Sequence, residues 1–171
     1  MSRTVITERL CLHAIEDKDL EAMLALFTDA EVYKTFMLPD FKCYEEQVKL
    51  FERLKTLSNQ AGRFVYGIYL HGELIGFLND VEIAGEEIEL GYVISPKHKN
   101  KGYATEALTA MMELLFTEGF TMVKAGAFEE NTASMRVMEK SGMTRIAKQD
   151  EITYRGKIHR CIYYEKNLKN K

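Results

Sequence analysis

The sequence predicts one mixed α/β domain, and three observations carry that prediction. The chain has 171 residues, which is enough for one well-packed core and short for two. Apolar residues recur with a period of two in some segments and at helical spacing in others. These segments alternate along the chain, and no repeat, linker or low-complexity stretch divides them. The prediction therefore assigns residues 1–171 to a single domain.

Individual segments justify the predicted elements. Residues 9–15 (RLCLHAI) alternate as a half-buried strand does. Asp17 is the candidate cap of the next helix, because a short carboxylate accepts first-turn amide hydrogens. Gly119 and Gly142 are placed to end two later helices. The predicted order is a strand at 9–15, a helix at 20–27, an irregular stretch at 33–42, a helix from 44, strands at 63–70, 73–82 and 86–95, a helix at 102–118, a strand at 122–128, a helix at 131–141, and a hairpin of 143–150 with 159–166.

Composition and charge exclude several classes of protein. With 46% hydrophobic and 29% charged residues, the chain resembles ordinary globular domains. A net charge of -3 gives the surface no general attraction for nucleic-acid phosphate. Three scattered cysteines and four histidines show no disulfide or metal-ligand spacing, so no metal is expected. No signal peptide or membrane-length apolar run is recognisable, which predicts a cytoplasmic protein without membrane contact.

A basic turn precedes the helix predicted at 102–118. The stretch SPKHKNKGYATEALTAMM, residues 95–112, places three lysines and a histidine just before the helix starts. Unpaired first-turn amides and the helix dipole attract anions, and Gly102 lets a ligand approach the backbone. Lys99 and Lys101 add full charges, so a phosphate or pyrophosphate site is indicated. The alternative is a solvated surface turn, and neither a dinucleotide fingerprint nor a Walker loop is present.

Three sequence blocks resemble the GNAT superfamily of N-acyltransferases. Residues 99–104 (KNKGYA) resemble its acyl-coenzyme A signature [RQ]-x-x-G-x-[GA], with Lys99 in place of the usual arginine or glutamine. Residues 130–143 (ENTASMRVMEKSGM) resemble a second conserved block of the family. Residues 7–15 (TERLCLHAI) are similar to the opening strand of the branch with the RimJ and RimL ribosomal-protein acetyltransferases. The blocks stand in the family's order across nearly the whole chain.

The resemblance implies a GNAT fold and a site for acetyl-coenzyme A. The implied fold has a central, mostly antiparallel sheet, splayed between its fourth and fifth strands, with helices on both faces. Pantetheine would lie in the gap between 86–95 and 122–128, near the backbone of Val93 and Ile94. Asn131 would hold the pantetheine arm. The residues implied to bind pyrophosphate are Lys99, Asn100, Lys101, Gly102, Tyr103, Ala104 and Thr105.

Acyl transfer to an amine requires a base and a donor to the leaving thiolate. Glu87 and Glu89 share one face of a predicted strand, and either could accept the amine proton. The alternative is that both face solvent, and the resemblance favours Glu89. Many relatives protonate the thiolate with a tyrosine at the position of Met138, which has no proton to donate. Ser134 is therefore the candidate donor, with an ordinary first-turn serine as the alternative.

The resemblance implies an acetyl-CoA-dependent N-acetyltransferase that acts by direct attack in a ternary complex. The RimJ/RimL blocks suggest the N-terminal α-amine of a protein as acceptor. The alternatives are a small-molecule amine, such as an antibiotic, polyamine or amino acid, and a non-catalytic CoA-binding or sensing module. Acceptor loops expected at 35–42 and 150–157 carry no recognisable code, although Tyr154, Tyr163 or Tyr164 could line an acceptor groove. The oligomeric state is open, with a homodimer as one alternative.

Overall fold

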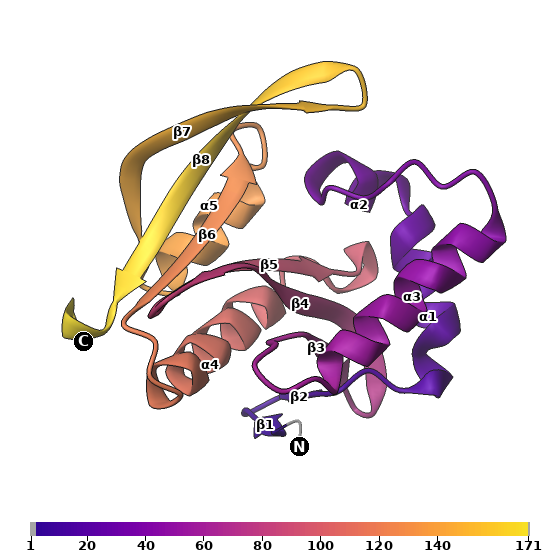
Figure 1. Cartoon of the computed structure of the whole chain (residues 1–171), viewed down its shortest axis with the longest axis horizontal. Coiled ribbons are helices and arrows are strands. Elements are labelled where there is room, and N and C mark those ends of the chain that lie inside the picture. The colour runs from indigo at the N-terminus through magenta and orange to yellow at the C-terminus, as the bar shows by residue number, and fades with distance from the viewer. Residues whose placement is uncertain (1–2, 171) are drawn as a thin grey trace. The chain divides into compact units, whose positions relative to one another are not determined.

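The computed structural model describes residues 3–170 and has the predicted mixed α/β class. Figure 1 shows its elements in chain order. They are β1 (Val5–Ile6), β2 (Leu10–His13), the 3-10 turn η1 (Asp17–Asp19), α1 (Leu20–Thr28), α2 (Ala30–Thr35), α3 (Tyr44–Ser58), β3 (Tyr66–Leu70), β4 (Glu73–Ala84), β5 (Glu87–Ile94), η2 (Pro96–His98), α4 (Tyr103–Thr117), β6 (Met122–Phe128), α5 (Thr132–Lys140), β7 (Thr144–Tyr154), β8 (Lys157–Asn167) and η3 (Leu168–Asn170).

The strands form one open mixed sheet in the order β1-β2-β3-β4-β5-β6-β8-β7. Where a register is defined within residues 3–170, β5 and β6 run parallel and the other pairs are antiparallel. Pairing of β5 with β6 starts at Glu87 and Met122 and ends at Leu90 and Ala125. Both strands continue beyond that point, β5 to Ile94 and β6 to Phe128. Pairing therefore stops between the two strands for which the splay was predicted.

The chain divides into two compact units. Unit 1 runs as far as Asn79 and includes Tyr92–Tyr103, and unit 2 contains Asp80–Gly91 and the described residues from Ala104 onward. Strands β4 and β5 each pass from one unit to the other. One domain over residues 1–171 stays a prediction, which a single cooperative unfolding transition would support.

Unit 1 is organised around an apolar core between its helices and strands. Met23 and Phe27 of α1 and Phe51 of α3 are almost fully buried there, with Phe77 of β4. Strand β5 joins this core through Val93. The two strands approach so closely that a Cβ atom at Gly76 would lie 2.2 Å from the Val93 carbonyl oxygen. The absence of a side chain at Gly76 thus allows β4 to lie close to the end of β5 that leads into the basic turn.

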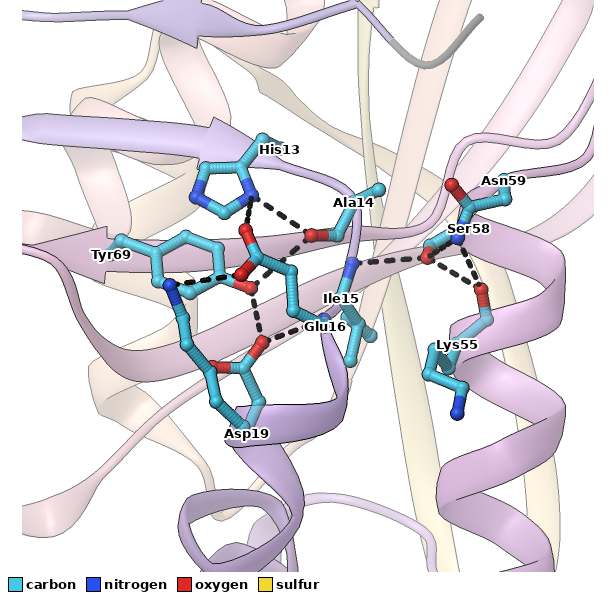
Figure 2. Close-up of polar contacts among 10 residues, drawn as sticks. His13, Ala14, Ile15, Glu16, Asp19, Lys55, Ser58, Asn59 and Tyr69 are labelled. Carbon is cyan, nitrogen blue, oxygen red and sulfur yellow. Dashed lines mark hydrogen bonds and ion pairs between the residues drawn. The ribbon is translucent and has the colours of Figure 1, made fainter.

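A polar cluster ties η1 to strand β3 in unit 1 (Figure 2). The Tyr69 hydroxyl donates to Asp19 Oδ2 at 2.6 Å, and the Glu16 amide donates to the same oxygen at 2.8 Å. The His13 ring stacks on Tyr69 with 3.8 Å between centroids. The predicted cap Asp17 is wrong, because Glu16 precedes the helical turn and Asp17 lies within it. Asp19 is the carboxylate that satisfies the turn's backbone.

The sheet of unit 2 has one apolar face and an opposite face on which charged side chains lie beside a small apolar cluster of Phe128, Cys161 and Tyr163. Ile88 and Leu90 of β5 are buried, as are Val123 and Ala125 of β6. The residues between them point to the opposite face, because side chains alternate along a strand. We call this opposite side the polar face, and its members used below are Glu87, Glu89, Lys124, Gly126, Tyr163 and Asp150. The helical stripe predicted as core is fully buried in α4: Leu108, Met111, Met112 and Leu115.

Three elements differ from the sequence prediction. Strand β1 and helix α2 were missed, and α2 occupies the start of the stretch predicted as irregular. The Asp29 side chain caps α2 by accepting from the amides of Glu31 and Val32. The β7–β8 hairpin, yellow in Figure 1, is longer than predicted. Most of the expected acceptor loop at 150–157 is therefore strand, closed by a tight turn in which Arg155 and Gly156 have positive φ.

Candidate functional site

The basic turn in unit 1 has the backbone of an anion site. Strand β5 ends at Ile94, η2 follows, and α4 begins at Tyr103. Asn100 and Gly102 have φ values of 60° and 81°, so the backbone adopts the left-handed conformation at both residues before the helix begins. Such conformations point successive N–H groups towards one side, and the first helical turn adds more donors. The predicted pyrophosphate residues, including Ala104 and Thr105 in the first turn of α4, form one continuous segment.

The charges at this turn are arranged differently from the prediction. Lys99 Nζ lies 2.6 Å from Glu31 Oε2 in an ion pair with α2. Arg9, which sequence reasoning missed, donates from Nη1 to the Lys101 carbonyl at 2.8 Å. Its guanidinium also lies 4.6 Å from the centre of the Tyr103 ring. The signal was present in the TERLCLHAI block, but 92 positions separate Arg9 from Lys101.

The end of β5 in unit 1 holds the two residues predicted to face pantetheine. Val93 is buried and Ile94 is half-buried. The Ser95 amide donates to the Ile75 carbonyl at 2.7 Å, which ties the strand end to β4. Within the described residues, His98 Nδ1 is buried without a hydrogen-bond partner. The end of β5 is therefore hydrogen-bonded to β4 just before the basic turn.

The two candidate bases lie on the polar face of unit 2. Glu87 forms an ion pair with Lys124 of β6. Glu89 lies beside Lys124 in the strand register and is half-buried. Burial raises the pKa of Glu89, and nearby Glu82 and Asp150 act in the same direction against Lys148 and Lys124. A half-buried carboxylate with a raised pKa is suited to accept protons near neutral pH.

Helix α5 of unit 2 carries the second group of predicted site residues. Asn131 is its N-cap, because Asn131 Oδ1 accepts from the Ser134 amide at 3.2 Å. The plain cap role considered from the sequence is thus present. Ser134 is half-buried in the first turn. Met138 is fully buried, so this position supplies packing and no proton.

A tyrosine–aspartate pair on the polar face was not predicted. The Tyr163 hydroxyl donates to Asp150 Oδ2 at 2.8 Å. The Tyr163 ring lies over Gly126, where an added Cβ would come within 2.8 Å of the ring. Burial raises the pKa of Tyr163 above its usual value, and the hydrogen bond to Asp150 adds to this. Nothing in the local sequence gives the pairing of β6 with β8 that brings Tyr163 to Gly126.

A β-bulge adds a lysine to this pair. The register of β7 with β8 shifts between Arg145 and Gln149. Lys148 lies in that shifted stretch, with Nζ 4.3 Å from the centre of the Tyr163 ring and 3.9 Å from Asp150. Bulges often redirect a side chain in this way next to functional sites. The pair is therefore flanked by a positive charge.

Over residues 3–170, no group of three or more histidine, cysteine, aspartate or glutamate side chains is placed to hold a metal ion. No helix among these residues is long and apolar enough to span a membrane.

Comparison with known proteins places these residues in a family. A model of the "Acetyltransferase (GNAT) domain" matches residues 9–144. The uncharacterized N-acetyltransferase YnaD of Bacillus subtilis is 34% identical over 143 residues, which cover 82% of each chain. The crystal structure of a GNAT-family acetyltransferase from Bacillus anthracis has a TM-score of 0.81 and 30% identity, covering 96% of this chain and 98% of that one.

More distant structures share the fold. A RimL ribosomal-protein acetyltransferase in complex with coenzyme A has a TM-score of 0.86 at 18% identity, and covers 99% of this chain and all of that one. The relatives named N-acetyltransferases support an enzyme over a non-catalytic coenzyme A-binding module. The basic turn, with its positive-φ backbone and lysines, fits the phosphates of the co-substrate acetyl-CoA. The chain belongs to the GNAT family of acetyltransferases and is an acetyl-CoA-dependent N-acetyltransferase.

Proposed function

We propose that the acceptor is the N-terminal α-amine of a protein or peptide. The observation that carries the proposal is Glu89, a half-buried carboxylate with a raised pKa on the polar face. An α-amine titrates near ~8 and a lysine amine near ~10.4, a difference of about 3 kcal/mol in the cost of deprotonation. A carboxylate base of raised pKa therefore serves an α-amine far better than a lysine. Two structures that share the fold are of RimL, a ribosomal L7/L12 α-N-protein acetyltransferase, which supports the same acceptor class.

The proposed reaction is direct attack in a ternary complex. The acceptor ammonium gives one proton to Glu89, and the freed nitrogen attacks the thioester carbonyl carbon. The C–S bond breaks as the amide forms, and the leaving thiolate takes a proton from the Ser134 hydroxyl. The nitrogen loses its second proton in the same step, and that proton restores the Ser134 hydroxyl. Ser134 is the candidate because Met138, at the position of the family's tyrosine, is fully buried and has no proton to donate. A backbone amide near Val93 is the candidate donor to the developing oxyanion.

Binding roles in this proposal follow the same residues. The segment Lys99–Asn100–Lys101–Gly102–Tyr103–Ala104–Thr105 takes the pyrophosphate, with backbone amides as donors and two lysines as charges. Val93 and Ile94 bond pantetheine through their backbone groups. Asn131 serves both as the cap of α5 and as a partner of the pantetheine arm.

A small-molecule amine is the second candidate acceptor. Asp150 lies on the polar face with 47% of its side chain exposed, so it could pair with a second cationic group of a polyamine or amino-sugar. Lys148, only 3.9 Å from Asp150, already neutralises part of that charge. For this reason the α-amine acceptor remains the proposal.

Matched acceptors test the proposal. A lysine-free peptide with a free N-terminus is compared with the same peptide blocked at its N-terminus and carrying one internal lysine. A polyamine and an aminoglycoside complete the set, and thiol release from acetyl-CoA is measured. We expect the highest kcat/KM with the free N-terminus. Turnover confined to the lysine peptide or to the small molecules would contradict the proposed acceptor.

A further inference from the structure

The positive charge expected at the start of the coenzyme A signature is engaged elsewhere. Lys99 stands at the position where the family has arginine or glutamine, and its ammonium is paired with Glu31 at 2.6 Å. Glu31 lies in the first turn of α2, two positions after the capping residue Asp29. A phosphate must therefore compete with a carboxylate for Lys99. The signature lysine alone is a weak source of charge for this site.

A guanidinium from another part of unit 1 lies on the same turn. Arg9 contacts three consecutive residues of the turn. Its Nη1 donates to the Lys101 carbonyl at 2.8 Å, and its guanidinium lies 4.6 Å from the centre of the Tyr103 ring. Its Nη2 lies 3.2 Å from the place that a Cβ atom of residue 102 would occupy. The absence of a side chain at Gly102 leaves room for this arrangement.

The backbone of Arg9 is held in place on both sides. Thr7 and Leu10 close a turn around it, with the Leu10 amide donating to Thr7 Oγ1 and the Thr7 amide donating to the Leu10 carbonyl, both at 2.9 Å. Leu10 is buried and pairs with Leu70 of β3. Because the backbone is already ordered there, fixing the Arg9 side chain costs only its own rotamer entropy. Arg9 is therefore preorganised at the turn.

We propose that Arg9 is the guanidinium of the pyrophosphate site, a positioning residue for the co-substrate. This inference rests on the proposed binding of pyrophosphate at residues 99–105. By holding the Lys101 carbonyl, Arg9 keeps that electronegative oxygen turned away from the phosphates and keeps the adjoining amides available. It also places a permanent positive charge beside Gly102. Lysine cannot replace it fully, because only the planar guanidinium combines the hydrogen bond with stacking on Tyr103.

The test compares two donors that differ in the pyrophosphate. Acetyl-CoA carries it, and acetyl-pantetheine does not. The variants are Arg9→Ala, Arg9→Lys and, as a matched control, Arg53→Ala, which removes an exposed arginine from α3 of the same unit. Calorimetry measures coenzyme A affinity, and steady-state kinetics gives kcat/KM for each donor.

The expected result is a loss that is specific to the pyrophosphate. Arg9→Ala should weaken coenzyme A binding on the order of tenfold, as loss of a charge-assisted hydrogen bond does. Arg9→Lys should retain part of the affinity, and Arg53→Ala should retain all of it. With acetyl-pantetheine, kcat/KM should stay within about twofold in each variant, because the remaining contacts are unchanged. Equal losses with both donors, or no loss with either, would overturn the role of Arg9.

The donor preference of wild-type protein tests pyrophosphate binding at the turn independently of the role of Arg9. If wild-type protein uses acetyl-pantetheine as well as acetyl-CoA, the turn does not bind pyrophosphate and both ideas fail. If wild-type protein prefers acetyl-CoA and Arg9→Ala keeps that preference, only the role of Arg9 fails. Glu31→Gln gives an independent check: freeing Lys99 should tighten coenzyme A binding by about twofold to fivefold, as expected for an exposed ion pair. Weaker binding in Glu31→Gln would contradict the competition for Lys99.

Discussion

Two tyrosine–aspartate pairs, one in each unit, have the same chemistry in different surroundings. The inner pair is Tyr69–Asp19 in unit 1, with 2.6 Å between hydroxyl and carboxylate oxygens. The outer pair is Tyr163–Asp150 in unit 2, with 2.8 Å between them. Each ring lies over a glycine, and a Cβ atom on that glycine would come within 2.7 Å of the Tyr69 ring or 2.8 Å of the Tyr163 ring. In both, burial and the aspartate raise the tyrosine pKa.

The pairs differ in how far the carboxylate is closed off. Asp19 is 3% exposed, and its Oδ2 also accepts from the Glu16 amide. Stacking of His13 covers the Tyr69 ring, as Figure 2 shows. Asp150 has 47% of its side chain exposed and lies near Lys148. The inner pair can therefore only hold structure together, whereas the outer pair can still meet a solute on the polar face.

Removing the aspartates should produce the largest difference in stability between the two pairs. Asp19→Ala leaves a buried hydroxyl and a backbone amide without their acceptor, so unfolding should become easier by about 2–4 kcal/mol. Asp150→Ala removes an exposed carboxylate and should change stability by less than about 0.5 kcal/mol. Urea unfolding followed by circular dichroism measures both. Equal losses in the free energy of unfolding would show that the exposure of the carboxylate does not determine its contribution to stability.

Removing the hydroxyls should give smaller effects in the same order. Tyr69→Phe should cost about 1–2 kcal/mol of stability, because Asp19 loses a buried donor. Tyr163→Phe should cost less than about 0.5 kcal/mol, since water can reach Asp150. If the outer pair lines the acceptor site, Tyr163→Phe should also raise the acceptor KM by a few fold while the KM for acetyl-CoA stays constant. An unchanged acceptor KM would show that the outer pair does not line the acceptor site.

The smallest expected effect is on how the stability of the inner pair depends on alkaline pH. A tyrosine whose pKa is raised by folding binds its proton more tightly in the native state. Its stabilising contribution is fully present below its unfolded pKa of ~10 and falls as pH rises above that value. Tyr69→Phe should therefore flatten the loss of stability above about pH 10. Urea unfolding at several alkaline pH values checks this. If stability depends on pH identically in Tyr69→Phe and wild-type protein, the raised pKa of Tyr69 does not contribute to stability.

Local patterns predicted the fold well where they were long. The strand Met122–Phe128 has the predicted bounds, since an apolar run between turn signals needs no knowledge of its partners. Helix α2 has six residues, too few for a helical period to emerge, although the Asp29 cap was readable. Asp17 resembled a cap, but the choice among Glu16, Asp17 and Asp19 depended on where Tyr69 lies.

Parts of the candidate site depend on which distant segments pair. Strand alternation pointed to Glu87 and Glu89 together and a helix cap pointed to Asn131, because both are local features, and the family resemblance then favoured Glu89. Tyr163 was named only as one of three tyrosines that could line the acceptor groove, because its place over Gly126 and its bond to Asp150 follow from the register of β8 with its neighbours. Arg9 was visible in a quoted block, but only tertiary structure brings it to Lys101. Chemistry carried by one segment was predictable, and chemistry shared between segments was not.

The pH–rate profile of Glu89→Gln tests most directly whether the polar face supplies the base. At neutral pH kcat/KM should fall by about 100-fold, a typical contribution of general base catalysis. The acid limb should flatten, and activity should partly recover at high pH, where the amine deprotonates unaided. Folding should be unharmed, because burial disfavours the charged carboxylate that the substitution removes. Glu87→Gln, which breaks only the ion pair with Lys124, should change the profile little. An unchanged profile in Glu89→Gln, or a larger effect in Glu87→Gln, would contradict the assignment of Glu89 as the base.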